Sequence, residues 1–254
     1  MTRAATMASA EWFDHSKTAA VRRRVRRILL RLAQRHLAMR AARPGTHRFD
    51  GLVLAVPTGV FHPGLFLSTS FLCRTLLTIE LAGRSFLEVG CGSGLVAIVA
   101  ARAGATVTAL DINPAAVRTT IENAAVNNVN IEVWQSDLFA SIEADRRFDV
   151  VAVNPPYFRK DPADVAERAW FAGANFEYFS AFFAQLASHS APDSLVLMIL
   201  GEDCDLSAIA AHAADHGFVM QLWRSGVVWF ERQLVFTFET ADSVKDDVDR
   251  MRRA

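Results

Sequence analysis

The fold is decided by one stretch of the sequence, Phe86-Leu87-Glu88-Val89-Gly90-Cys91-Gly92-Ser93-Gly94. An apolar run ends there in three glycines separated by single residues, and apolar residues at helical spacing follow from Leu95 to Val99. This order predicts a buried strand that turns tightly into a helix. Glycine suits the turn because it adopts positive φ and lets a ligand approach the backbone closely. The helix that follows presents free N–H groups at its start.

Strand and helix patterns alternate on the carboxyl side of this turn. Such alternation predicts an α/β fold whose parallel sheet is covered by helices on both faces. The last two strand patterns, 218–223 and 233–238, are close enough for an antiparallel hairpin with a loop around 224–226. The other expected strands are 106–110, 131–134, 148–153 and 194–200, and the expected helices are 114–126, 176–189 and 206–216.

On the amino-terminal side of the turn, residues 49–56 have the pattern of a short strand or hairpin arm. A segment rich in turn-forming residues follows, and Ser68 or Thr69 is the expected cap of the next helix. The buried side of that helix is predicted to carry Phe71, Leu72, Leu76 and Leu77.

The composition limits the class of protein. The chain has 254 residues, of which 52% are hydrophobic and 21% are charged, as in an ordinary globular protein. No apolar run is long enough to span a bilayer, and residues 1–16 lack the apolar core of a secretory signal. The three cysteines are far apart and show neither a disulfide framework nor metal-ligand spacing. These features predict a cytoplasmic protein with no metal site.

The formal net charge of zero hides a strong asymmetry. Residues 1–43 hold eleven basic and two acidic residues, a charge of +9 that the rest of the chain balances with −9. From about residue 18 to 42 apolar residues recur on one helical face, and arginines cover much of the other side. Three interpretations are open for this arm. It packs as a helix on the acidic body, contacts nucleic acid through residues 22–43, or lies on a membrane surface.

Polar residues suited to nucleoside binding follow the ends of three predicted strands. In an open α/β sheet, ligands bind outside the carboxyl ends of the strands. The glycine turn ends the first strand, and Asp111 ends the second, where its carboxylate can accept hydrogen bonds from both ribose hydroxyls. Asp137 follows the third and can accept a bond from an adenine amino group, with Leu138 or Phe139 packed on the base. Together these residues predict a cofactor that contains a nucleoside.

The most specific motif is Asn154-Pro155-Pro156-Tyr157, directly after the strand pattern 148–153. The prolines fix the backbone and leave their carbonyls as acceptors. The side-chain oxygen of Asn154 and the carbonyl of Pro155 can accept both hydrogens of a planar NH2 group and so orient its nitrogen toward a methyl donor. Tyr157 can stack on the flat amide or base. Positioning and electrostatics then suffice without a strong base.

These motifs resemble those of class I S-adenosylmethionine (SAM)-dependent amino-methyltransferases. Within this class, about residues 58–240 are most similar to the HemK-like family, which methylates the side-chain amide of a glutamine in translation release factors. The resemblance rests on 88–94, Asp111-Ile112-Asn113, Asp137-Leu138 and 154–157, with support from 60–63, 69–72 and 169–173.

The resemblance implies a Rossmann-like, seven-stranded, mostly parallel sheet with an antiparallel last strand. This methyltransferase domain is expected at 46–240, between an N-terminal helical arm, 1–45, and a charged tail, 241–254. The implied cofactor is SAM, with Glu88 near its methionine end and Phe61 and Thr69 near its pocket. The expected catalytic residues are Asn154, Pro155, Pro156 and Tyr157. The expected cofactor-binding residues are Phe61, Thr69, Glu88, Gly90, Cys91, Gly92, Gly94, Asp111, Ile112, Asp137, Leu138 and Asn154.

The methyl acceptor stays open at this point. The first possibility is a glutamine amide of a release-factor-like protein. The second is an exocyclic amine of adenine or guanine in tRNA, rRNA or DNA, which the arginine-rich arm favours and the acidic body disfavours. The third is a small-molecule amine. A different possibility is that the protein is a non-catalytic subunit that binds a partner through the arm. The segment 64–69 lacks an acidic residue that is common in the family, and nothing in the sequence indicates an oligomeric state.

Overall fold

The computed structural model describes residues 43–65, 67–228 and 231–240. The predictions for the basic arm before residue 43 and for the tail 241–254 concern residues outside these ranges. The structure places the elements as follows: β1 Gly45–Phe49, β2 Leu52–Val56, α3 Leu67–Leu76, β3 Ser85–Val89, α4 Leu95–Arg102, β4 Thr106–Asp111, α5 Pro114–Val126, β5 Glu132–Gln135, β6 Phe148–Val153, η1 Glu167–Ala169, α6 Glu177–His189, β7 Ser190–Gly201, α7 Leu206–Asp215, β8 Phe218–Val228 and β9 Glu231–Thr240.

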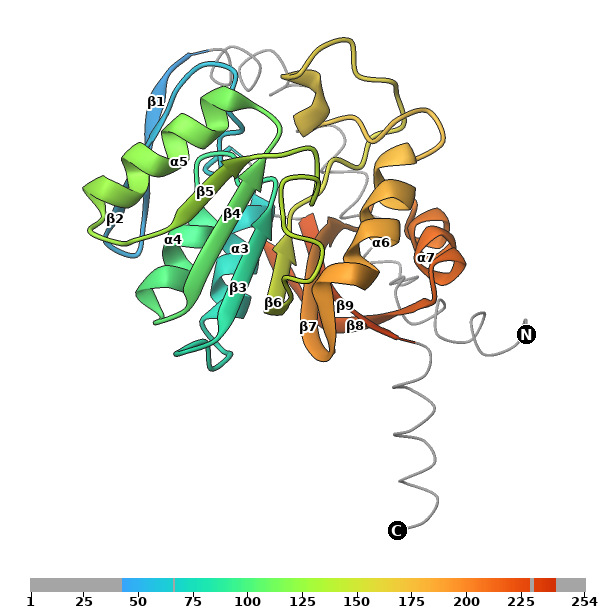
Figure 1. The fold of residues 1–254 in the computed structure, drawn as a ribbon. Helices are drawn as coiled ribbons and strands as arrows, with labels where there is room; N and C mark the ends of the chain where they lie inside the picture. Colours follow the sequence, from blue (N-terminus) through green and yellow to red (C-terminus); the bar gives the residue numbers. More distant parts are fainter. Residues whose placement is uncertain (1–42, 66, 229–230, 241–254) are drawn as a thin grey trace.

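A seven-stranded sheet forms the centre of the described domain (Figure 1), with the strand order β5-β4-β3-β6-β7-β9-β8. The pairings from β5 to β7 are parallel, and β9 pairs antiparallel with both β7 and β8. The predicted mostly parallel sheet with an antiparallel last strand is therefore confirmed. Because β3 and β6 are neighbours while the chain runs from β3 outward to β5, the strand order reverses between β3 and β6.

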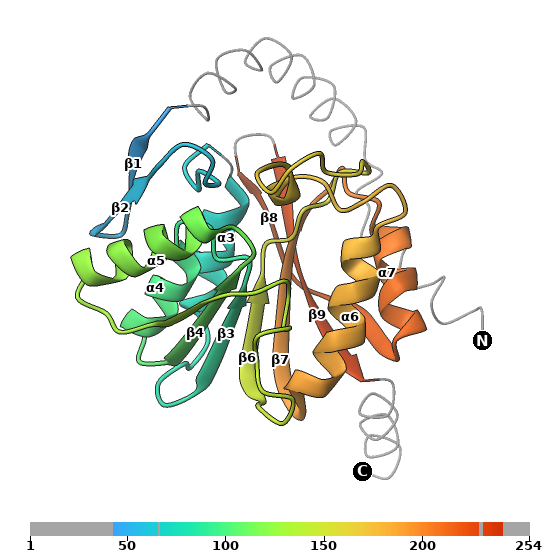
Figure 2. The ribbon, with the colours of Figure 1, turned by 45° about the horizontal axis from the view of Figure 1, so that its top comes forward.

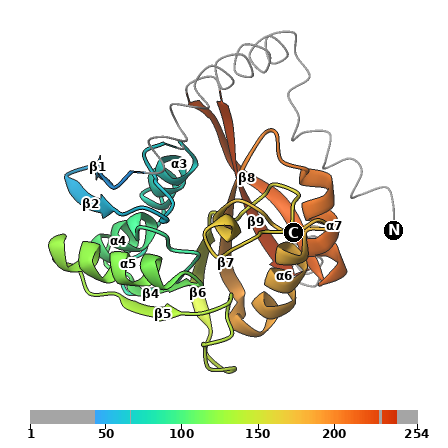
Figure 3. The same cartoon turned by 90° about the horizontal axis from the view of Figure 1, so that it is seen from above.

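Helices cover both faces of this sheet, as Figure 3 shows from above. On one face α3, α4 and α5 close a core around Leu72, Ile98 and Val235. On the other face α6 and α7 pack through Phe179, Phe182 and Ile209. The two cores explain why the strands between them read as nearly continuous apolar runs.

Two helices begin where local chemistry predicts. The side chain of Asn113 accepts a hydrogen bond from the backbone N–H of Ala115, and Pro114 occupies the first turn of α5. Asp205 caps α7 in the same way through the N–H of Ala208. The predicted span 114–126 of α5 is confirmed.

A small hairpin, β1–β2, lies beside α5 (Figure 2) and is held there by two asparagines. The side-chain amide of Asn123 exchanges hydrogen bonds of 2.8 and 2.9 Å with the backbone N–H and carbonyl of Ala55. The amide of Asn127 does the same with Val53 at 3.0 and 2.9 Å. The two side chains thus bond the backbone N–H and carbonyl groups of β2 as a neighbouring strand would.

Three sequence-based expectations about local structure are wrong. No loop interrupts 224–226: β8 passes through a bulge at Trp223 and runs on to Val228, because its register with β9 shifts between Leu222 and Arg224. Ser68 and Thr69 do not precede α3 as caps but lie inside its first turn. The same helix ends at Leu76, so Leu77 leaves the buried face and is 51% exposed.

Core packing against α7 makes one prediction about stability. Ile209 is fully buried, and we expect Ile209→Val to lower the free energy of unfolding by about 0.5–1.5 kcal/mol. Ile121→Val is the matched control because Ile121 is half exposed, and a change within about 0.5 kcal/mol is expected there. Urea unfolding of both variants measures the difference, and equal losses would contradict the assignment of Ile209 to the core.

No helix within the described part of the chain is both long enough and apolar enough to cross a membrane.

Candidate active site

A cavity of about 500 Å³ lies at the carboxyl ends of β3, β4 and β6, beside the reversal of strand order. Open α/β sheets bind their ligands at this position. The cavity brings together predicted residues that are up to 96 positions apart, from Phe61 to Tyr157. The expected site residues that line it are Phe61, Thr69, Glu88, Gly90, Cys91, Gly92, Asp111, Ile112, Asp137, Leu138, Asn154, Pro155, Pro156 and Tyr157.

The glycine turn is shaped by its contacts with β4. The N–H groups of Gly90 and Cys91 both donate to the carbonyl of Leu110, at 2.8 and 2.9 Å. Gly90 has a φ of 78°, and a Cβ placed on it would meet no atom within 4 Å. The backbone at Gly90 is therefore open to a ligand.

Gly94, also expected to bind the cofactor, does not line the cavity. Its φ is 82°, and a Cβ there would come within 2.8 Å of Thr120 on α5. The third glycine of the motif is therefore required for the close packing of the turn on α5.

Asp111 connects the glycine turn to the end of β4. One of its carboxylate oxygens accepts from the N–H of Gly92 and the other from the N–H of Asn113, both at 2.8 Å. Each carboxylate oxygen keeps acceptor capacity for a further donor, so the pair fits the two hydroxyls of a ribose. Desolvation raises the pKa of Asp111, although the N–H groups of Asn113 and Gly92 oppose the shift.

Glu88 is the most deeply buried acid of the cavity, with 4% of its surface exposed. One carboxyl oxygen accepts from the backbone N–H of Ala97 in α4 at 2.8 Å. Desolvation raises the pKa of Glu88 well above its ordinary value, and the negative charge of Asp111 adds to the rise. A cation bound beside Glu88, such as the amino group of a methionine moiety, would offset this cost of ionisation.

The raised pKa makes stability depend on pH. In the unfolded chain Glu88 ionises as the pH passes its ordinary pKa of 4.5, whereas in the folded protein it ionises only at higher pH. Stability is therefore fully retained below pH 4.5 and falls as the pH rises from there to the raised pKa, by about 1.4 kcal/mol per pH unit. We expect Glu88→Gln, without ligand, to match the wild type at pH 4 and to be more stable at pH 8. Urea unfolding at about these two pH values tests this, and parallel pH profiles would contradict it.

Asp137 has a partner that the sequence did not suggest. Arg168, which also lines the cavity, approaches its carboxylate to 3.4 Å, and the side chains of Arg168 and Asp137 are 47% and 65% exposed. Spacing gave no signal for this contact because the two residues belong to segments 31 positions apart. The adenine-binding role of Asp137 stays a prediction.

Asn154 lies at the end of β6 with its side chain held by α3. Its Nδ2 donates to Thr69 Oγ1 at 3.1 Å and to Ser68 Oγ at 3.3 Å. Ser68 was expected only as a helix cap, yet it lines the cavity with Thr69. Tyr157 packs against Phe158, with ring centroids 4.8 Å apart.

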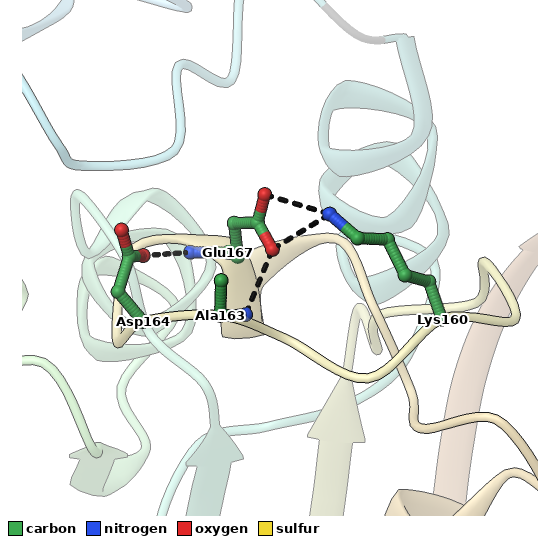
Figure 4. Close-up of polar contacts among 4 residues, drawn as sticks. All are labelled: Lys160, Ala163, Asp164 and Glu167. Atoms are coloured by element: carbon green, nitrogen blue, oxygen red, sulfur yellow. Dashed lines mark hydrogen bonds and ion pairs between the residues drawn. The ribbon is translucent and has the colours of Figure 1, made fainter.

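The segment from Phe158 to Gly173 forms one wall of the cavity and is braced by its own polar contacts. Lys160 Nζ lies 2.9 Å from both carboxylate oxygens of Glu167, and these contacts are the dashed lines between the two side chains in Figure 4. Glu167 also accepts from the N–H of Ala163 at 2.8 Å, and its own N–H donates to Asp164 at 2.9 Å. At its base, Phe158 and Phe171 form a short parallel bridge.

All three cations of this segment have carboxylate partners. Besides Lys160 and Arg168, Arg159 lies 3.2 Å from Asp205 and over the ring of Phe176. In the cavity lining, the rings of Phe61 and Trp170 lie with their centroids 5.2 Å apart. This side of the cavity therefore combines aromatic surface with internally balanced charge.

Taken together, the strand order, the glycine turn with its acidic partner, and the Asn-Pro-Pro-Tyr motif in one cavity define a class I SAM-dependent methyltransferase domain. Comparison with known proteins agrees: residues 52–175 match the family model described as the methyltransferase small domain.

Two similar proteins are assigned to glutamine methylation. A protein of Methanocaldococcus jannaschii assigned as a protein N5-glutamine methyltransferase is 44% identical over 109 residues, which are 42% of this chain and 52% of that protein. The release factor glutamine methyltransferase of Fusobacterium nucleatum is 32% identical over 122 residues, 46% of this chain and 34% of that protein. Both relatives are assigned to glutamine methylation, which agrees with the resemblance of the motifs to the HemK-like family. Aligned residues thus span between a third and about half of the length of these relatives.

Other matches leave the substrate open. The ribosomal protein L11 methyltransferase of Bordetella parapertussis is 42% identical over 120 residues, 46% of this chain and 36% of that protein. The structure of the Thermus thermophilus 16S rRNA N2 G1207 methyltransferase, with AdoMet and guanosine, superposes with a TM-score of 0.61. It is 20% identical, and the match covers 78% of this chain and 50% of that one. This likeness establishes the fold alone.

Proposed function

We propose that this protein transfers a methyl group from SAM to the side-chain amide nitrogen of a glutamine in a protein substrate of the release-factor type. The observation that carries the proposal is the placement of Asn154 and Pro155 in the same cavity as the glycine turn and Asp111. Bound SAM would supply the electrophilic methyl group. Its positive sulfonium would make that methyl group reactive toward an amide nitrogen, which is a weak nucleophile, and would leave as a neutral thioether when the methyl–sulfur bond breaks.

The residues of this chain would act by positioning. The backbone at Gly90 and the carboxylate of Asp111 would hold the nucleoside, and Glu88 would face the cationic methionine end. The Asn154 side-chain oxygen and the Pro155 carbonyl would accept the two amide hydrogens, which fixes the nitrogen and concentrates electron density on it. The proton is then released from the methylated nitrogen to water. Tyr157 would stack on the flat amide.

Two features support a protein acceptor over a nucleic acid. The relatives assigned to glutamine methylation are 32% and 44% identical over their matched regions. In addition, the cations of the cavity wall are already paired with carboxylates, whereas a nucleic acid needs cations for its phosphates. Residues 22–42 of the basic arm lie outside the described structure, so a contact of this arm with a partner stays a prediction. The cytoplasmic location is part of the proposal and agrees with three buried free thiols at Cys73, Cys91 and Cys204.

The test is methyl transfer from labelled SAM into an extract from cells that lack this protein. We expect label in a protein of release-factor size and, after complete proteolysis, in N5-methylglutamine. An extract from cells that contain the protein is the control and should take up less label, because its acceptor is already methylated. Label confined to RNA or DNA, or to small molecules, would overturn the glutamine assignment. SAM binding without any transfer would overturn the enzymatic one.

A further inference from the structure

The first turn of α3 presents two hydroxyl groups to the side chain of Asn154, from 85 and 86 positions away in the sequence. Both hydroxyl-bearing side chains are buried, with 7% exposure for Thr69 and 8% for Ser68. The bonds to Asn154 Nδ2 measure 3.1 Å from Thr69 and 3.3 Å from Ser68. All three side chains line the cavity.

A primary amide has a donor end and an acceptor end of nearly the same shape, and only its hydrogen bonds decide which end faces which way. Here the hydroxyls of Ser68 and Thr69, which can donate as well as accept, both accept from the NH2 end of Asn154. The Oδ1 end of Asn154 is therefore left for other partners. A reversed amide would turn its own NH2 toward the NH2 of an acceptor, and neither group can accept the bond that the other offers.

We propose that Thr69, assisted by Ser68, is the positioning residue that fixes the orientation of the Asn154 amide. This orientation makes the site prefer a methyl acceptor whose nitrogen donates hydrogen bonds. This inference rests on the proposed function, since it assumes that Asn154 receives the acceptor nitrogen. Thr69 forms the shorter of the two bonds, and its branched Cβ restricts the hydroxyl to few rotamers.

The helix that carries these hydroxyls is itself firmly placed. Leu72, Cys73 and Leu76 of α3 are fully buried in the core on this face of the sheet. The end of β6 is equally buried at Val153. The hydroxyls and Asn154 are thus held by two rigid elements, so the orientation of the amide is set before an acceptor arrives.

Thr69→Val tests this inference because it removes the hydroxyl and keeps the shape. We expect the turnover number at saturating SAM to fall about tenfold, in line with the loss of one hydrogen bond, and the affinity for SAM to change less than this. Thr69→Ser should restore most of the turnover, and Thr69→Val with Ser68→Ala should lose more than either change alone. Thr75→Val is the matched control: Thr75 lies in the same helix and is fully buried, and the one described hydrogen bond of its hydroxyl goes to the carbonyl of Phe71. It should leave turnover unchanged.

A second measurement does not depend on the acceptor. In protein labelled with 15N, the two side-chain amide protons of Asn154 should exchange slowly with water in the wild type. These protons should exchange faster in the double variant that combines Thr69→Val with Ser68→Ala. In Thr75→Val they should exchange as slowly as in the wild type. If the wild type methylates no protein, the proposed function fails, while this exchange measurement still tests the positioning. Unchanged turnover and exchange in Thr69→Val would overturn the inference. A weaker SAM affinity with unchanged turnover would overturn it too, because it would make Thr69 a cofactor contact only.

Discussion

We expect Asn154→Ala to lower the turnover number for methyl transfer about 100- to 1000-fold while leaving the affinity for SAM within about threefold of the wild type. The side chain lies at the end of β6, and its Nδ2 bonds α3, so its oxygen is the group available to the acceptor. The Asn154 oxygen is the hydrogen-bond acceptor that positions the reacting nitrogen. Its loss therefore reduces the rate of the chemical step rather than the binding of the methyl donor. Calorimetry with SAM and single-turnover transfer of labelled methyl measure the two quantities separately.

Asn175→Ala is the control for this experiment. Asn175 is exposed, lies outside the cavity lining, and bonds Glu177 at the start of α6. Turnover and SAM affinity should both stay at wild-type values. If Asn154→Ala weakened SAM binding and left the rate at saturating SAM intact, Asn154 would be a cofactor residue and the proposed role in catalysis would be wrong.

We expect Asn123→Ala to lower the free energy of unfolding by about 1.5–4.5 kcal/mol, since it removes three hydrogen bonds worth about 0.5–1.5 kcal/mol each. Two of these bonds hold Ala55 of β2, and the third runs from Nδ2 to the carbonyl of Ser93 in the glycine turn at 2.9 Å. Asn123 is 1% exposed, so water cannot easily replace it. The same change should weaken SAM binding, because it frees the turn that lines the cavity.

Asn127→Ala separates the two effects. Asn127 also bonds β2, through Val53, but makes no contact with the glycine turn among its described bonds. It should destabilise the fold and leave SAM affinity unchanged. Equal losses of affinity in both variants would show that the hairpin, not Ser93, carries the effect. Urea unfolding and calorimetry on the two proteins give the comparison.

Most of the fold could be predicted because its signals are local. The apolar run before Gly90, the cap at Asn113 and the strand before Asn154 each act through neighbouring residues, and the structure places these elements as expected. The strand ends then meet at one edge because parallel strands end together. Fourteen of the expected site residues line one cavity for this reason.

What could not be predicted depends on contacts between distant segments. Ser68 reaches Asn154 only because α3 packs on the sheet against β7 and β9, and Arg168 reaches Asp137 only because the wall segment folds back over the cavity. The continuation of β8 through 224–226 was hidden because Ser225 and Gly226 are typical of turns. Pairing with β9 overrides that local preference, and a Cβ at Gly226 would come within 2.6 Å of the Phe71 ring, which would have to shift.

The pairing of α5 with β2 also sets a limit on the lifetime of the molecule at high temperature. Asparagine amides are among the side chains that heat destroys first. Hydrolysis would turn Asn123 or Asn127 into an aspartate that still accepts from the N–H of Ala55 or Val53 but has no hydrogen to give to the carbonyl beside it. A negative oxygen would then face a carbonyl oxygen at each site. Chemical ageing of one amide would thus begin to detach the hairpin from the domain while every peptide bond was still intact.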